Sequence, residues 1–199
     1  MVSDPDAALM LAFQGGDESA FRTLFEKYGR SMVGYCNHFV KDTARAEELA
    51  QDVFLNVYRS AGRYQPTARF KTYLYRIASN HCLNELRRSE YSARRELDRA
   101  ADEPDAVVEP DALASDAATP EQASLASALG AAVERLLARL PDKQRAAFVM
   151  ARFEGLSYDE IAEALGTTMS AVKSLVHRAT VSAAAALAPF ASEVEEELP

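Results

Sequence analysis

Five polar and aromatic side chains between residues 69 and 87 recur at separations of four, three, four and seven residues. At about 100° per residue this spacing aligns them along one side of a helix. They are Arg69, Tyr73, Arg76, Asn80 and Arg87. Guanidinium groups neutralise phosphates, and an aromatic face replaces the stacking that a base loses when it leaves a duplex. The stripe therefore predicts a surface for unpaired bases.

A helix over 69–91 is expected to carry this stripe, because apolar residues recur on its other side. These are Phe70, Leu74, Ile77, Ala78 and Cys82. The segment before it, residues 62–67, contains Gly62 and Pro66 and is predicted to be a loop. For Phe70 and Tyr75 we expect core packing rather than base contact.

A second informative stretch, residues 157–178, predicts two short helices that meet at a corner. Ser157 and Glu160 have the spacing of a capping box, which starts a helix by satisfying its free amides. Gly166 can end that helix in a left-handed conformation. Thr168 can cap the next helix. The pattern is that of a helix-turn-helix, whose second helix enters the major groove of DNA; an ordinary helical hairpin is the alternative.

Nearly all apolar residues recur at intervals of three and four, and we find no alternating strand pattern, so the predicted fold is all-α. Asp17 stands where a cap would, and Pro141 falls between two helices. We expect helices at 5–14, 17–38, 43–61, 69–91, 125–139, 142–153, 157–165 and 169–187.

Charge is segregated along the 199 residues, although the net charge is -8. Residues 59–88 hold seven basic side chains against one acidic side chain. Residues 92–124 are rich in Ala, Asp, Glu and Pro, and such a composition predicts a flexible acidic linker. The predicted organisation is two small helical domains, 1–91 and 125–190, joined by this linker and followed by an acidic tail, 191–199.

Several functional classes are disfavoured by the sequence. It has no glycine-rich phosphate loop, nucleophile motif or metal-ligand cluster, so neither an enzyme nor a cofactor is expected. His38, His81 and His177 are scattered, and Cys36 and Cys82 form no CxxC pair and are expected to be buried apolar residues. No membrane span or signal segment is found, so a cytoplasmic protein without membrane insertion is expected.

Two sets of motifs resemble those of bacterial sigma factors, the promoter-recognition subunits of RNA polymerase. The runs Asp17–Phe21, Ala46–Phe54, Tyr73–Asn80 and Leu86–Arg88 are similar to sigma region 2. The runs Leu140–Arg145, Gly155–Ala162 and Val172–Arg178 are similar to region 4. The short chain with only a linker between the two regions resembles the extracytoplasmic-function (ECF) group of the sigma-70 family.

The resemblance implies a transcription initiation factor with three sets of binding residues. Region 2 would take the -10 element, with its single-stranded bases, through Arg63, Tyr64, Arg69, Lys71, Tyr73, Arg76, Asn80 and Arg87. Region 4 would take the duplex -35 element through Thr168, Ser170, Ala171, Lys173, Ser174, His177 and Arg178. Core RNA polymerase would contact Glu47, Glu48, Gln51, Asp52 and Phe54, for which a solvated acidic face is the alternative. An anti-sigma factor is a further implied partner.

The chain departs from the family pattern at several positions. Tyr73 stands where Trp is common, and Asn84 where Asp is usual. In the predicted recognition helix, Leu175 and Ala171 replace a common Arg and Thr, and basic residues are missing beyond Arg178. We therefore expect weak phosphate anchoring at -35. Two rival functions are a helix-turn-helix regulator that binds duplex DNA without polymerase and a pure interaction module.

Overall fold

The structure, a computed structural model, describes residues 4–100 and 120–196, and within these residues it consists of helices joined by short loops. The prediction of an all-α protein is confirmed. The elements are α1 (Pro5–Gln14), α2 (Glu18–Val40), α3 (Thr43–Ser60), the 3₁₀ turn η1 (Ala61–Arg63), α4 (Phe70–Ala100), α5 (Pro120–Arg139), α6 (Asp142–Arg152), α7 (Tyr158–Ala164) and α8 (Met169–Glu196). None of the helices in the described part of the chain combines the length and hydrophobicity that a bilayer span requires.

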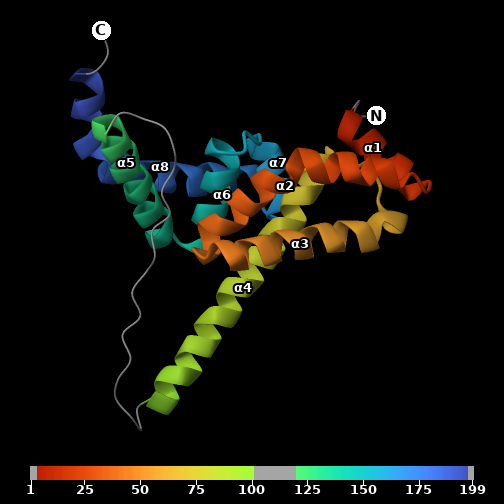
Figure 1. Ribbon diagram of the computed structural model, residues 1–199, viewed down its shortest axis with the longest axis horizontal. Helices are drawn as coiled ribbons and strands as arrows, with labels where there is room; N and C mark the ends of the chain where they lie inside the picture. The colour runs from red at the N-terminus through yellow and green to blue at the C-terminus, as the bar shows by residue number, and fades with distance from the viewer. Residues whose placement is uncertain (1–3, 101–119, 197–199) are drawn as a thin grey trace.

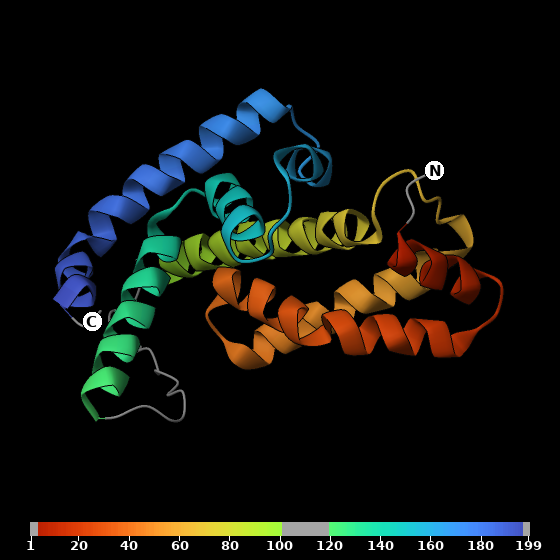
Figure 2. The ribbon, with the colours of Figure 1, turned by 90° about the horizontal axis from the view of Figure 1, so that it is seen from above.

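Helices α1–α4 form an N-terminal lobe, and α4 lies between the other helices of this lobe and the C-terminal helices (Figure 2). The core of the lobe is aromatic: the Tyr35 and Tyr75 rings meet edge to face with centroids 5.1 Å apart. The Tyr35 hydroxyl also shares a 2.8 Å hydrogen bond with Ser79. As the sequence predicted, Phe70 and Tyr75 are core residues, because neither is exposed at all.

Helices α5–α8 form a C-terminal lobe, in which α6 and α7 pack on one end of α8 and α5 packs on the other (Figure 1). The predicted helix-turn-helix is confirmed in detail. Ser157 and Glu160 form the capping box, and the φ of Gly166 is 59°. Thr168 accepts a hydrogen bond from the amide of Ala171 at 3.2 Å. Ile161 and Val172 are fully buried between the helices.

Three helix ends differ from expectation. Helix α4 runs to Ala100 rather than to 91, and α5 begins at Pro120 rather than at 125, so both ends of the expected linker 92–124 are helical. Residues 92–100 are mostly Arg, Glu, Leu and Ala, which favour helix. Helix α8 runs to Glu196 through Pro189, past the expected end at 187 and into the expected tail. The remaining linker and tail positions lie outside the described residues.

One buried carboxylate starts two helices. The Oδ1 atom of Asp4 accepts a hydrogen bond from the amide of Asp6 at 3.2 Å in the first turn of α1. Its Oδ2 atom accepts one from the amide of Phe70 at 2.6 Å, at the first residue of α4. Asp6 in turn accepts from Lys27 at 2.6 Å and from the Tyr28 hydroxyl. The start of α4 is therefore fixed by a residue more than sixty positions away.

The two cysteines are fully buried, as expected, but they also face each other between α2 and α4. Their Sγ atoms lie 3.7 Å apart and both thiols are free. The contact with Cys36 and burial raise the pKa of the Cys82 thiol well above its usual value. Both side chains therefore serve the core as small apolar groups.

Replacing Asp4 by Ala should destabilise the N-terminal lobe, because two amides then lose their acceptor in a buried setting. With about 1 kcal/mol for each capping interaction, we expect a loss of about 2 kcal/mol. Urea unfolding of the full chain measures it. Asp17→Ala removes one exposed cap of α2 and should cost distinctly less. Equal losses in the two variants would show that Asp4 does not join the two helices.

Candidate nucleic-acid interface

The outer face of α4 carries the predicted stripe. Arg76, Asn80 and Arg87 are exposed, and the Arg76 guanidinium lies over the Tyr73 ring at 5.4 Å from its centroid. The Tyr73 hydroxyl shares a 2.6 Å hydrogen bond with Ser60, which holds the half-buried ring in place. This face offers a positioned aromatic ring with a cation stacked on it, next to an exposed amide.

Tyr64 does not offer a stacking surface, because it is only 4% exposed. Its ring packs edge-on against Tyr73 at 5.0 Å between centroids, and also against Phe70. Its hydroxyl is buried without a hydrogen-bond partner, and burial raises the pKa of Tyr64 to about 12. In this conformation the Tyr64 ring supports Tyr73, and a contact between Tyr64 and a base stays a prediction.

The loop between α3 and α4 is held from α1. The side-chain amide of Gln14 donates to the carbonyl of Ala61 at 2.9 Å and to that of Tyr64 at 3.3 Å. Arg63 remains exposed at the end of η1. The sequence analysis missed Gln14, and no local pattern marks a residue whose partners lie about fifty positions further along the chain.

Two of the predicted -10 residues face the C-terminal lobe. Lys71 donates a hydrogen bond to the main-chain carbonyl of Glu154, which follows α6. Arg69 pairs with Glu160 of α7 at 3.3 Å. The stripe seen in the sequence is thus divided: its first cation is engaged within the chain, whereas Arg76, Asn80 and Arg87 face outward.

Tyr75 makes a third contact between the lobes. Its hydroxyl donates to the carboxylate of Glu154, and burial together with this hydrogen bond raises its pKa. Burial alone would raise the pKa of Glu160, but hydrogen bonds from Ser157 and the charge of Arg69 outweigh it, and the pKa is lowered. Glu160 is therefore held as a carboxylate facing α4.

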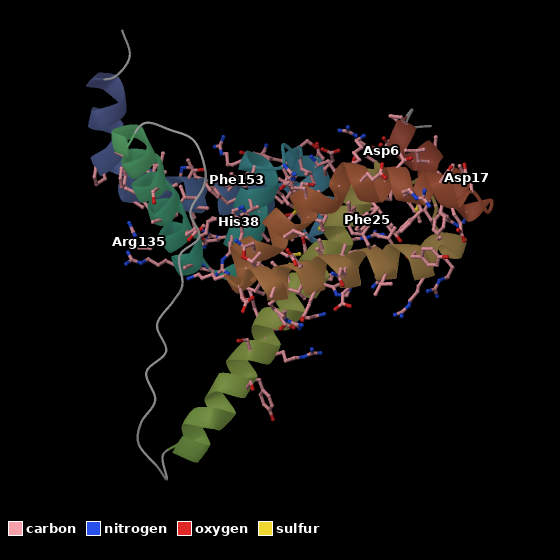
Figure 3. The ribbon with its side chains drawn as sticks, in the orientation of Figure 1. Asp6, Asp17, Phe25, His38, Arg135 and Phe153 are labelled. Atoms are coloured by element: carbon pink, nitrogen blue, oxygen red, sulfur yellow. The ribbon has the colours of Figure 1, made fainter. Side chains whose placement is uncertain are left out.

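Aromatic contacts complete the packing between the lobes. The rings of His38 on α2 and Phe153 after α6 lie together, with centroids 5.1 Å apart (Figure 3). The Arg145 guanidinium lies over the ring of Phe39 at 5.6 Å. Burial lowers the pKa of His38, with Glu134 acting against this shift and Arg145 adding to it.

A groove of about 730 Å³ opens beside the first half of α8. Four predicted -35 residues line it: Lys173, Ser174, His177 and Arg178. Arg152 from the end of α6 and Tyr158 from α7 line it as well, and the sequence analysis missed both. Arg152 places a further cation beside the predicted recognition helix, whose sequence holds few cations.

Other predicted -35 residues have different positions. The hydroxyl of Thr168 accepts the hydrogen bond that caps the start of α8, and the Ala171 side chain is half-buried. Ser170 is exposed, and its carbonyl accepts a hydrogen bond from Ser174 at 3.1 Å. None of the three lines the groove.

The acidic face of α3 is exposed as expected at Glu47, Glu48, Gln51 and Asp52. Phe54 is buried at 4% exposure and lies beneath this face, so its contact with core polymerase stays a prediction. It packs instead under Phe25, with ring centroids 4.8 Å apart.

Exposed apolar side chains lie over this buried ring and beside it. Phe25, Leu55 and Tyr58 are each nearly half exposed, and Phe25 is labelled in Figure 3. Leu55 and Tyr58 are one turn apart on α3, a spacing that could have indicated a second apolar side of this helix. We call Phe25, Leu55 and Tyr58 the aromatic face.

A polar cleft of about 400 Å³ separates α3 from α4. Asp52 and Asn80, which the sequence assigned to different partners, both line it. Arg45 crosses its end, with ion pairs to Glu85 at 2.7 Å and to Glu48 at 2.5 Å. The predicted polymerase face and the predicted -10 face therefore meet along one cleft.

Comparisons with known proteins place both lobes in one family. The family description "Sigma-70 region 2" matches residues 24–91, and "Sigma-70, region 4" matches residues 130–180. The RNA polymerase sigma-H factor of Pseudomonas aeruginosa is 34% identical over 97% of this chain and 99% of its own length. The ECF RNA polymerase sigma factor SigW of Bacillus subtilis is 27% identical over 82% of this chain and 86% of its own length.

Two solved structures share the fold. CnrH, solved in complex with the cytosolic domain of CnrY, has a TM-score of 0.67 at 22% identity, covering 94% of this chain and 99% of that one. RpoE of Bartonella quintana, solved with the anti-sigma factor NepR, has a TM-score of 0.56 at 20% identity, covering 84% and 96%.

Proposed function

This chain belongs to the sigma-70 family of RNA polymerase sigma factors, in the extracytoplasmic-function group, and we propose that it recognises promoters at -10 and -35 and opens them. The observation that carries the proposal is the presence of two separate cationic surfaces. One lies on the outer side of α4 and consists of four residues, which we call the α4 stripe: Tyr73, Arg76, Asn80 and Arg87. The other is the groove beside α8.

The α4 stripe suits an extruded base. Stacking on an aromatic ring contributes about 1–3 kcal/mol per base, whereas a DNA duplex step is worth about 1.4 kcal/mol. Because the two are comparable, the Tyr73 ring with Arg76 over it can hold a base out of the duplex without nucleotide hydrolysis. Asn80 supplies the donor and acceptor that can read the edge of that base.

The groove beside α8 suits duplex DNA at -35. Lys173 and Arg178 stand on the predicted recognition helix, and Arg152 faces them from α6. Cations on two sides of a groove can meet phosphates while Ser174 and His177 reach base edges.

Core polymerase is the proposed partner of α3. Its acidic side chains supply charge complementarity to basic groups, and the aromatic face supplies apolar contact area beside them. Interface cores are enriched in aromatic residues of this kind. An anti-sigma factor that covers the aromatic face would keep the chain away from polymerase, and we propose such a partner.

Run-off transcription with purified core polymerase on a library of upstream sequences tests the function. We expect specific starts that depend on this protein. The alternative function is a regulator that binds duplex DNA without polymerase, and the open groove beside α8 favours it as the second candidate. Such a regulator would retard its target DNA in a gel in the absence of polymerase. Gel shifts with and without core polymerase separate the two.

Arg76→Ala and Asn80→Ala should impair promoter opening while leaving core affinity nearly unchanged, because both side chains stand on α4 and not among the acidic and apolar residues of α3 that are proposed to meet polymerase. The loss of one base contact should slow opening roughly tenfold. Permanganate footprinting measures opening, and co-migration with core measures affinity. Glu47→Ala should show the opposite pattern. If the α4 variants lost affinity for core polymerase to the same extent, the stripe would be part of the polymerase interface and not of the DNA interface.

Arg152→Ala should reduce the salt dependence of duplex binding. Each phosphate contact contributes about -0.9 to the slope of log K against log salt. We expect the slope measured with the full chain to become shallower by about 0.9 in Arg152→Ala. The Lys173→Ala variant should show a change of the same size. Arg135 is exposed on α5 outside the groove, so Arg135→Ala is the control. An unchanged slope in Arg152→Ala would remove Arg152 from the interface.

A further inference from the structure

We propose that Met169 is a specificity-determining residue, which recognises the C5-methyl group of a thymine in the -35 element. The inference rests on the proposed function, because it takes α8 to be the helix that enters the major groove at -35. It adds the chemical feature that one position of the duplex has to offer. The thymine can belong to either strand, since its methyl group lies in the major groove in both cases.

Met169 is the first residue of α8 and follows Thr168, whose side chain caps the helix. In helix-turn-helix proteins the N-terminal residues of the recognition helix contact the base edges. The Met169 residue is 42% exposed. A large apolar group is therefore open to solvent at the position where a helix of this type meets DNA.

The residues that follow Met169 form the outer side of α8. Exposed residues recur in pairs along the first turns, at 169–170, 173–174 and 177–178, and each of the first two pairs is followed by a half-buried and a buried residue. Within these three pairs Met169 is the only apolar residue. It stands one turn before Lys173, which lines the groove beside α8. Met169 therefore lies at the leading end of the surface assigned to duplex DNA.

The N-terminal lobe leaves Met169 open. Within the described part of the chain, α7 lies between α4 and the start of α8 (Figure 2). Leu175, another apolar side chain in these turns, differs from Met169 because it packs against the hydrophobic core. The large apolar side chain that these turns offer to DNA is therefore Met169.

Met169 can distinguish base pairs only through the thymine methyl group. In the major groove the base pairs differ in their hydrogen-bond donors and acceptors and in that methyl group. The thioether is at most a weak acceptor and donates nothing. Contact with the methyl group removes apolar surface of both partners from water, which favours thymine at the contacted position. The unbranched, flexible chain of methionine adapts to an irregular edge.

The cations of the same surface have a different role. Lys173 and Arg178 line the groove and can meet phosphates, which positions α8 without reading sequence. Changing Met169 should therefore alter which sequence is preferred and leave the salt slope of duplex binding as it is in the native chain. Lys173→Ala should do the converse, and the two variants together separate recognition of a base from attachment to the backbone.

The first test selects upstream sequences from a randomised duplex pool, using the full chain assembled on core polymerase. We expect one -35 position of the selected sequences to favour thymine. In Met169→Gln this preference should be lost, while the preferences at the other positions remain. Glutamine keeps the length and the helix propensity of the side chain and makes its end polar.

Val181→Gln is the matched control. Val181 is 57% exposed on the same helix, about 18 Å farther along at roughly 1.5 Å per residue. The major groove is only about 12 Å wide. We therefore expect Val181→Gln to leave the selected -35 sequence unchanged.

A second test removes the methyl group from the DNA. Deoxyuridine pairs as thymidine does and lacks only the C5-methyl group, so it can replace the selected thymine without changing a hydrogen bond. By competition gel shift, holoenzyme with the native chain should bind the deoxyuridine duplex about fourfold more weakly, the effect of one buried methyl group. With Met169→Ala the two duplexes should bind nearly equally, so the two changes are not additive.

The outcomes separate this inference from the proposed function. Selected sequences without a favoured -35 thymine, or an unchanged preference in Met169→Gln, would overturn the inference and leave the proposed function intact. Equal binding of the two duplexes by the native chain would do the same. A uniform loss of affinity for all sequences in Met169→Gln would assign Met169 to packing or polymerase contact, and would also overturn it. If holoenzyme selected no -35 sequence at all, the proposed function would fail and the inference with it.

Discussion

Helix α4 is a core element and also carries the proposed DNA surface, and the hydrogen bond from the Phe70 amide to Asp4 fixes where it begins. A helix turns by about 100° per residue, so a change of one residue in the packing register of α4 would turn the cationic stripe away from its outward direction. The buried Phe70 and Tyr75 rings lock the opposite side. The positions of Arg76 and Asn80 therefore depend on packing that neither of them makes.

The same helix also explains how a protein with net charge -8 can bind DNA. Its cations lie within a short stretch, and in the free chain some of them meet carboxylates of the other lobe. Local pairing lowers the field that would attract unrelated nucleic acids, because each carboxylate cancels a cation at close range.

The sequence predicted the features that local spacing controls. The capping box, Gly166 and the apolar side of α4 are in place, because caps and helical periodicity act within one or two turns. The burial of Tyr64 and Phe54 could not be predicted, because both depend on rings from distant elements. Arg152 reaches the groove through the turn between helices, and only the three-dimensional arrangement puts it there.

The weakness of the contact between the lobes decides which ligand can separate them. A ligand shifts a two-state equilibrium only by its difference in affinity for the two states. The contact between the lobes is polar, and Arg69 keeps 58% of its side chain exposed beside Glu160, so this ion pair contributes little to the free energy of the arrangement. A partner that binds the two lobes in a different arrangement therefore needs only a modest difference in affinity to change how they sit.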